Sequence, residues 1–263
     1  IMAEGDNWYD VRVYVANLGK YNEGTLMGAW ATLPMERDEL DAFLRDEVGI
    51  DTDPAMVQAK LARGGRPYEE YQIADCDMPF WMPKGLVDEN TNLEDLNVMA
   101  GVMSTLSGGM DDARKAQVWA DDNMISDMSA RGATSSLPLV FANYALQADD
   151  IPFHEYEAGT REDLHVSSNE EAFAWSVAET DPELREALDG RFGTFIDMEA
   201  VGRDYSLDCV LYDDGYLDKA EDEGVDPTMY SRGELTCLAG LDDGDGMCAA
   251  ADLADDMGKG LAR

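Results

Sequence analysis

Carboxylates are the side chains through which this chain could do chemistry, and they are too numerous to single out one catalytic pair. The chain has 56 Asp and Glu residues against 19 Lys and Arg residues, a formal net charge of −37. Two carboxylates can act as general acid and base, but no particular pair stands out here. A dense anionic surface offers a second chemistry, because carboxylates can occupy cationic grooves that otherwise bind phosphates. At the charge density of duplex DNA, this charge corresponds to about 60 Å of helix axis.

The other reactive side chains are few and scattered. The two histidines, His154 and His165, stand apart from any nucleophile motif, and a lone histidine is more often structural than catalytic. There is no phosphate-binding glycine loop, no G-x-S-x-G segment and no H-E-x-x-H segment. The cysteines form no C-x-x-C pair, so we expect free structural thiols in a reducing compartment and no zinc site. They are Cys76, Cys209, Cys237 and Cys248.

An Asp- and Gly-rich run near the C-terminus invites a calcium-loop interpretation that its spacing does not support. Counted from Asp243, position six is Cys248 instead of the glycine that an EF-hand loop requires. No glutamate closes the loop at position twelve. We therefore expect neither a metal nor a cofactor. No run of 18 apolar residues is present, so we also expect no transmembrane helix.

The elements that must position the carboxylates can be read from hydrophobic periodicity. Alternating valines at 11, 13 and 15 predict a half-buried strand, followed by a turn and a partner strand over 24–32. Apolar residues at helical spacing predict a helix over 36–48 that ends at Gly49. A further strand is predicted over 68–77.

Capping signals place the helices of the remaining chain. Thr91 with Glu94 forms one S/T-x-x-E pattern and Ser168 with Glu171 forms another, each typical of a helix start. Pro182 after Asp181 marks a further helix start. We expect helices from these starts and over 111–130, 139–146 and 195–204, with strands over 151–157 and 205–212.

This succession predicts an α+β fold built as an elongated chain of small domains. The sheet and its helix form an N-terminal α+β domain at 1–83, and a helical middle domain follows at 84–147. A mixed α/β domain follows at 148–212. An acidic C-terminal extension, rich in Asp, Gly and Ala, occupies 213–263.

Several segments resemble one protein family. Residues 13–34 read VYVANLGKYNEGTLMGAWATLP, which is similar to the opening of the ArdA-type antirestriction proteins. The resemblance continues at 68–75 and 92–97, and resumes at 195–200 and 202–204, in the order found in the family.

The resemblance implies a cytoplasmic inhibitor carried by mobile genetic elements, and not an enzyme. Such proteins mimic DNA in shape and charge and block restriction of incoming DNA. The implied partner is a type I restriction–modification enzyme, whose DNA-binding groove in the methyltransferase and specificity subunits the inhibitor occupies. The resemblance also implies three small domains and a homodimer formed through the third of them, at 148–212. A protein of this kind binds neither nucleic acid nor membrane.

Two sets of residues follow from this interpretation. The first set is architectural, shaping the hairpin and the later G-R-D segment: Asn17, Gly19, Tyr21, Asn22, Gly24, Gly202, Arg203 and Asp204. The second set consists of exposed acids that stand in for phosphates: Glu69, Glu70, Asp75, Asp77, Glu94, Asp95, Asp111, Asp112, Asp121, Asp122, Glu170 and Glu171. We expect the five tryptophans to lie in the core or in an interface: Trp8, Trp30, Trp81, Trp119 and Trp175.

Two other classes of protein have the same composition. An acidic or halophilic globular protein or enzyme would spread its carboxylates evenly over one globule. An acidic binder of basic DNA-associated proteins would concentrate them in flexible tails. Mimicry instead requires carboxylates arranged along the body at phosphate-like spacing.

Overall fold

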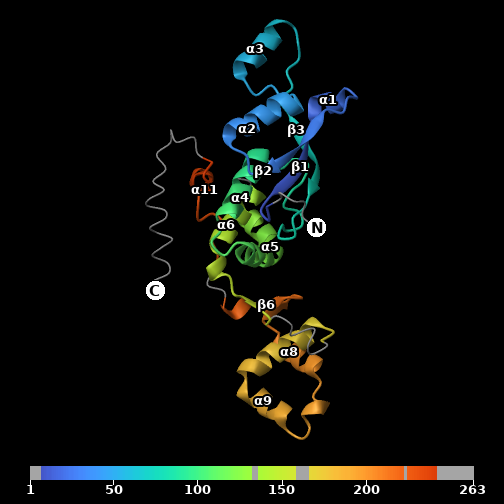
Figure 1. The fold of residues 1–263 in the computed structure, drawn as a ribbon, viewed down its shortest axis with the longest axis vertical. Helices are drawn as coiled ribbons and strands as arrows, with labels where there is room; N and C mark the ends of the chain where they lie inside the picture. The colour runs from blue at the N-terminus through green and yellow to red at the C-terminus, as the bar shows by residue number, and fades with distance from the viewer. Residues whose placement is uncertain (1–6, 132–135, 158–165, 222–223, 242–263) are drawn as a thin grey trace. The chain divides into compact units, whose positions relative to one another are not determined.

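The computed structural model describes residues 7–131, 136–157, 166–221 and 224–241. The chain forms two compact units (Figure 1). Unit 1 combines Ile1–Ala148 with Asp226–Arg263, and unit 2 is Asp149–Val225. Each unit joins helices to a small antiparallel sheet, which confirms the α+β class. The division into 1–83, 84–147, 148–212 and 213–263 stays a prediction.

The sheet of unit 1 has three strands in the order β2-β1-β3. The strands are β1 Val11–Asn17, β2 Gly28–Leu33 and β3 Tyr71–Asp77, and both pairings are antiparallel. Alternation of side chains along β1 sends its valines to one face, where Val11, Val13 and Val15 have no exposed surface. The predicted strands are therefore present, although β2 and β3 are shorter than expected.

The helices around this sheet are short and change type. They are α1 Leu18–Asn22, α2 Arg37–Ala42, the π-helical η1 Phe43–Val48 and α3 Pro54–Ala62. The helix predicted over 36–48 is thus α-helical at first and π-helical at its end, and Gly49 ends it with a φ of 76°. Asp53 caps α3, which begins at Pro54, and this helix was not among those predicted from the sequence.

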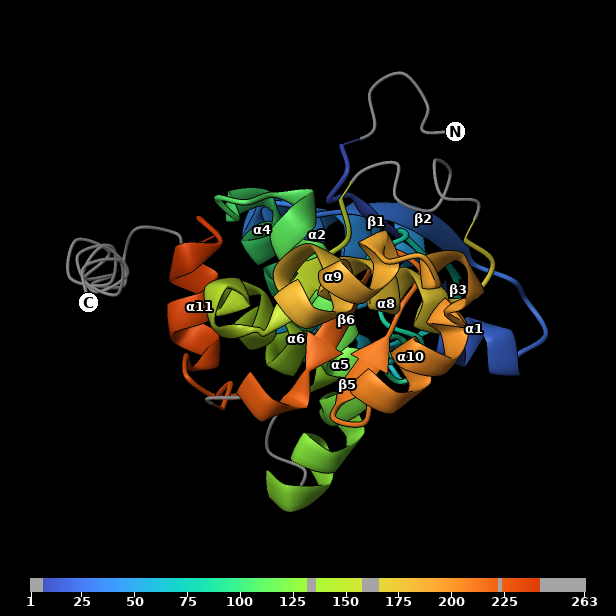
Figure 2. The same ribbon diagram turned by 90° about the horizontal axis from the view of Figure 1, so that it is seen from below.

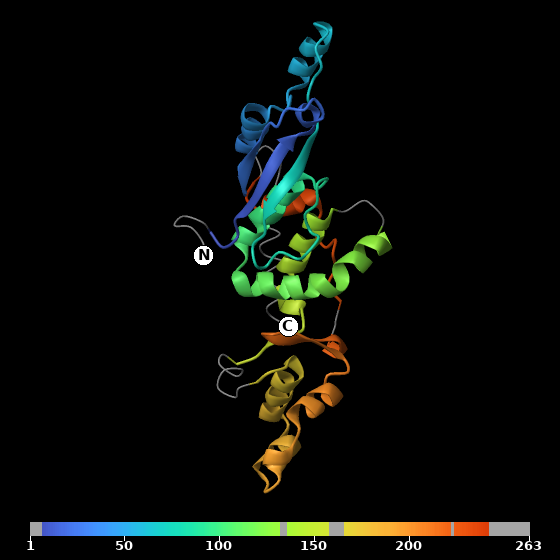
Figure 3. The same cartoon turned by 90° about the vertical axis from the view of Figure 1, so that its right-hand side faces the viewer.

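Three longer helices complete the main body of unit 1. These are α4 Leu93–Thr105, α5 Met110–Arg131 and α6 Leu137–Leu146, and Figure 3 shows α5 running crosswise to the strands. The side chain that caps α4 belongs to Asn92, which accepts from the backbone N–H of Asp95, and not to the predicted Thr91. Trp81 and Phe141 stack in the core with ring centroids 5.9 Å apart.

The described part of the C-terminal segment, 226–241, belongs to unit 1 and contains helix α11, Arg232–Leu238, which lies beside α4 and α6 (Figure 2). Two amide side chains, one in α6 and one at its C-terminal cap, hold the backbone of this segment. Gln147 donates to Asp226 O at 2.8 Å and accepts from Asp226 N at 3.0 Å. Asn143 donates to Tyr230 O at 3.1 Å and accepts from Tyr230 N at 2.7 Å. Both amides are buried, so this segment is an integral part of the unit.

Unit 2 is smaller and has a thin core. Its strands, in the order β4-β6-β5, are β4 Phe153–Glu155, β5 Cys209–Leu211 and β6 Gly215–Asp218. Its main helices are α8 Asn169–Thr180, α9 Pro182–Asp189 and α10 Met198–Tyr205. A Cβ on Gly202 would lie 1.8 Å from Glu170 O, so this glycine lets α10 approach α8. Three short 3-10 turns link these elements: η2 Ala148–Asp150, η3 Gly193–Phe195 and η4 Lys219–Glu221.

The hairpin motif of unit 1 is held by a buried amide and a close approach. The Asn17 side chain donates to Val48 O and Gly49 O and accepts from Lys20 N. A Cβ on Gly19 would lie 2.5 Å from Tyr68 Cδ1, so the ring packs directly against the α1 backbone.

We predict that Gly19→Ala destabilises the protein by about 1–3 kcal/mol, because the added methyl group displaces the Tyr68 ring. Gly233→Ala is the matched control. Gly233 is also helical, nothing lies within 4 Å of its Cβ position, and alanine favours helix. Thermal unfolding of both variants measures the difference, and equal stability of the two would contradict the role of Gly19.

Candidate functional site

The predicted acids lie on four stretches of the chain. Two of these acids lie just before β3 and two lie within it. Two more lie at the start of α4, four lie along α5, and two lie in the first turn of α8. Acids in a first helical turn are favoured by the positive end of the helix dipole. Asp112, Glu170 and Glu171 are half-buried, and those that are exposed are Glu69, Glu70, Asp75, Asp77, Glu94, Asp111, Asp121 and Asp122.

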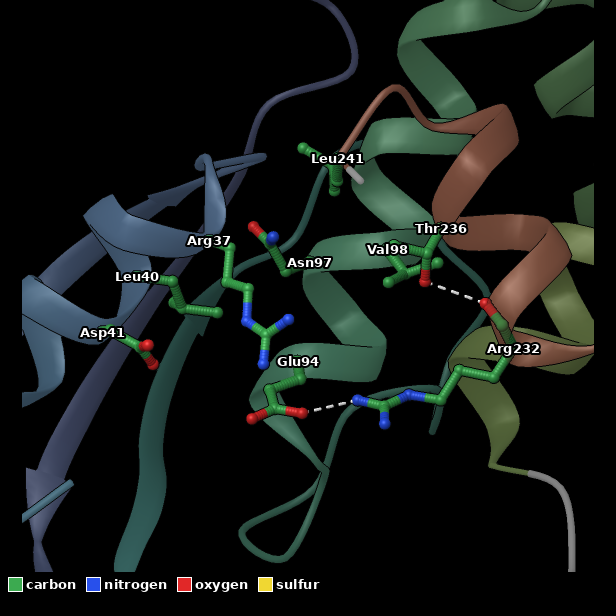
Figure 4. Close-up of a pocket in the computed structure, with 9 residues that line it drawn as sticks. All are labelled: Arg37, Leu40, Asp41, Glu94, Asn97, Val98, Arg232, Thr236 and Leu241. Carbon is green, nitrogen blue, oxygen red and sulfur yellow. Dashed lines mark hydrogen bonds and ion pairs between the residues drawn. The ribbon is translucent and has the colours of Figure 1, made fainter. Parts of the chain in front are cut away.

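Asp95 departs from the prediction, because it is buried and not exposed. Its Oδ1 atom lies 2.7 Å from Nε of Arg232 in an ion pair. The same guanidinium donates to Glu94 Oε2 at 2.6 Å (Figure 4). Arg232 belongs to α11, more than a hundred residues further along the chain. The two carboxylates therefore serve to hold the C-terminal segment against α4.

The hydrogen bond from Arg232 to Glu94 is the main cause of a raised pKa for this guanidinium. Burial acts against the shift, and the charge of Asp95 adds to it. The arginine therefore stays charged at any pH at which the protein is folded.

A pocket of about 220 Å³ lies where α2, α4 and α11 meet (Figure 4). Four of its polar side chains have hydrogen-bond partners in the described part of the chain. Glu94 pairs with Arg232, and the Asn97 amide binds the backbone N–H and C=O of Met35, both at 2.8 Å. Thr236 donates to Arg232 O. The pocket therefore lies at the contact between the C-terminal segment and the rest of unit 1. It is lined by Arg37, Leu40, Asp41, Glu94, Asn97, Val98, Arg232, Thr236 and Leu241.

A second ion-pair network fixes the approach to the acids before β3. Lys60 of α3 donates to both oxygens of Asp51, at 2.8 and 2.6 Å, and Tyr68 N donates to the same carboxylate. Burial raises the pKa of Asp51, but the hydrogen bonds from Lys60 and Tyr68 outweigh it, so the pKa lies below its ordinary value. The Tyr68 hydroxyl donates to Glu23 at 2.8 Å. Glu69 and Glu70 follow directly from this anchored residue.

The environment of one acid on α5 differs from that of a freely solvated carboxylate. Partial burial raises the pKa of Asp121, while Arg114 and Lys84 act in the opposite direction. Asp112 accepts from Gly108 N at 2.7 Å and so stabilises the start of the helix. Asp112 therefore has a local structural role in addition to any role in binding, whereas the Asp121 carboxyl ionises less readily than a freely solvated one.

The motif residues expected to be architectural lie in two places. Asn17 is buried and Gly24 has a φ of 80°, a backbone conformation that glycine adopts without strain. Tyr21 and Asn22 are exposed. In unit 2, Gly202 is buried, Asp204 is exposed, and Arg203 pairs with Glu199 at 2.8 Å.

The cysteines differ from one another in the structure. Cys76 and Cys209 are free, and burial, aided by neighbouring carboxylates, raises the pKa of each to about 11. Both thiols are therefore protonated at neutral pH and poor nucleophiles. Cys237 is disulfide-bonded, so the expectation of four free thiols is wrong for this residue. Cys248 lies outside the described residues.

The remaining candidates for chemistry are few. His154 Nε2 lies 2.8 Å from Glu221 Oε2, and its ring stacks on Tyr216 with centroids 5.0 Å apart. His165 and the run at 242–246 lie outside the described residues. Within the described ranges, no three His, Cys, Asp or Glu side chains converge as metal ligands would.

The tryptophans divide between core and surface. Trp81 and Trp119 are buried, as expected, and Trp8 is half-buried with its backbone oxygen accepting from Trp81 Nε1 at 2.8 Å. Trp175 is partly buried beside the core of unit 2. Trp30 differs, because 44% of its surface is exposed on the sheet of unit 1.

These features define an acidic α+β protein that presents carboxylates from several elements in both of its units. The chain matches the family model described as Antirestriction protein (ArdA) over residues 13–218, and it therefore belongs to that family. Its function is thus antirestriction, its partner class is the restriction enzyme, and the family is one of inhibitors. No curated protein matches the chain. None of the described helices is long and apolar enough to span a membrane.

We predict that Arg232→Met lowers the free energy of unfolding by about 1–3 kcal/mol, because it leaves the buried Asp95 carboxylate unpaired. The loss is smaller than for a fully buried pair because Arg232 is half exposed. Adding Asp95→Asn removes the stranded charge and restores part of the stability. Arg203→Met is the matched control, since it breaks an exposed helical pair worth only about 0.5 kcal/mol. Urea denaturation measures all four proteins, and equal losses in the two arginine variants would contradict this role.

Proposed function

We propose that this protein is a DNA mimic that occupies the DNA-binding groove of a type I restriction–modification enzyme, in its methyltransferase and specificity subunits. The observation that carries the proposal is family membership combined with exposed carboxylates on β3, α4 and α5. The protein acts in the cytoplasm on behalf of mobile DNA that enters a restricting cell. Its own action makes and breaks no covalent bond.

The mechanism is competition for a basic groove. Carboxylates on the inhibitor interact with the lysines and arginines that otherwise hold DNA phosphates, through the same screened Coulomb attraction. The net charge of −37 also repels nucleic acid, so the protein does not bind the DNA that it protects. Because many contacts share the binding energy, no single carboxylate dominates it.

The proposal includes a homodimer formed through unit 2. Exposed large apolar residues gather in one stretch of that unit, around η3 and the end of α10. Phe195 and Leu207 are each 82% exposed, Phe192 is 62% exposed and Tyr205 is 51% exposed. Soluble proteins seldom leave apolar surface of this kind open to water unless a partner covers it.

We predict that neutralising the α5 acids weakens inhibition in steps. Asp121→Asn alone has little effect, because one exposed charge contributes little. Replacing Asp111, Asp112, Asp121 and Asp122 together by asparagine weakens inhibition markedly while the protein stays folded. The measurement is competition with duplex DNA for a purified type I methyltransferase, at two salt concentrations.

The matched control neutralises four other exposed acids, in the region of α8 and α9: Glu179, Glu183, Glu186 and Asp189. If this set weakens inhibition as much as the α5 set does, net charge and not position determines binding, and the acidic-globule alternative gains support. Loss of inhibition by one substitution in a folded protein would refute the distributed mechanism.

We predict that Leu207→Asp converts the dimer into a monomer, because it places a charge in an apolar contact. Leu26→Asp is the matched control, since Leu26 is a leucine of unit 1 with 73% of its surface exposed. Sedimentation velocity distinguishes the two variants. A monomeric parent protein, or a dimer that survives Leu207→Asp, would contradict the proposed interface.

A further inference from the structure

The outer face of the β2-β1-β3 sheet carries an aromatic pair. The valines of β1 point to the core, so Arg12 and Tyr14 lie on the opposite face. Tyr14 is directly opposite Trp30 on β2, and their rings meet edge to face with centroids 5.7 Å apart. Trp30 is 44% exposed, although burying an indole is strongly favourable. The sheet thus presents an indole face to its surroundings.

Carboxylates border this pair on the other side of β1. In the register with β3, Asp75 is opposite Tyr14 and Asp77 is opposite Arg12. Both acids are exposed. The face therefore places carboxylates on the strand next to the aromatic pair. An aromatic ring and a carboxylate side by side are the groups that recognise a cation.

The protein already places a guanidinium on this face. Arg12 Cζ lies 5.7 Å from the centroid of the Trp30 ring. Its Nη1 atom lies 3.5 Å from Asp77 Oδ2, and the two side chains are 44% and 65% exposed. An exposed pair of this kind contributes little to stability, so another guanidinium can replace Arg12 at small cost.

We propose that this face is a docking site for an arginine side chain on the basic surface of the partner protein. The site consists of Tyr14, Trp30, Asp75 and Asp77, and Arg12 is its occupant in the free protein. The proposal rests on the proposed function, because the DNA-binding groove supplies the arginines. Arginine is favoured over lysine because its planar guanidinium stacks on an indole while donating to carboxylates at its edge.

The test uses two blocked amino acids of equal charge, N-acetyl-arginine amide and N-acetyl-lysine amide, titrated into the full-length protein. Binding is followed by NMR at the backbone amides of β1 and β3. We expect a saturable response to the arginine compound and a weaker one to the lysine compound. Trp30→Leu abolishes the difference between the two, and Trp30→Phe retains part of it.

The most direct test is Arg12→Gln, which removes the guanidinium that occupies the site in the free protein. We expect it to lower the Kd for the arginine compound by about two- to fivefold, the change that corresponds to one exposed cation–π contact. Arg45→Gln is the matched control, because it removes the same charge from an exposed ion pair with Asp46 on η1. Equal responses to arginine and lysine, or equal effects of the two Arg→Gln variants, would overturn the proposal.

The result is separable from the proposed function. If the parent protein competes with DNA for the methyltransferase but shows no preference for arginine, the docking site is refuted and the mimic stands. If the arginine preference depends on Trp30 but the parent protein does not compete with DNA, the site stands and the proposed function fails. A response to single-stranded oligonucleotides at these same amides would overturn the choice of a protein partner.

Discussion

Repulsion among like charges is the constraint on which the rest of this structure depends. With 56 acidic residues and 19 basic ones, compaction brings carboxylates together at a cost that the fold must offset. Some of the few cations hold separate segments of the chain together. Arg232 ties α11 to the start of α4, and Lys60 ties α3 to Asp51. Apolar burial stabilises each unit and these ion pairs stabilise unit 1, while most of the other described acids stay at the surface.

The same constraint separates two kinds of acid that look alike in the sequence. Glu94 and Asp95 are adjacent and both pair with Arg232, yet Glu94 is exposed and Asp95 is buried. Asp51 is bound by Lys60 and the backbone of Tyr68, whereas Asp75 and Asp77 remain exposed. Asp51 and Asp95 are therefore held by cations that join separate segments, whereas Asp77 meets the exposed Arg12, a pair that contributes little to stability.

Local patterns predicted much of the fold, and long-range contacts account for what they missed. The alternation of valines in β1 and the caps at Ser168 and Asp181 depend on neighbours a few residues away, and the structure confirms them. Helix α11 is short, and its place depends on Asn143 and Gln147, which are 79 or more residues distant. Arg232 of this helix pairs with the buried Asp95. Because the sequence pattern did not predict α11, it also did not predict that this candidate acid is buried. The exposure of Trp30 could not be predicted from the sequence either, because it depends on which face of the sheet the helices cover.

The path of the chain has a consequence for synthesis. Unit 1 is discontinuous: the ribosome completes its sheet and first helices, then makes all of unit 2, and only afterwards releases the segment that contains α11. Until that segment emerges, the amides of Asn143 and Gln147 lack their backbone partners and Asp95 lacks its cation. The surface that the segment later covers is open to water until then, and the hydrogen bonds and the ion pair that the segment supplies are absent, so the nascent N-terminal unit cannot reach full stability on its own. Complete folding of unit 1 therefore requires that translation has passed Arg232.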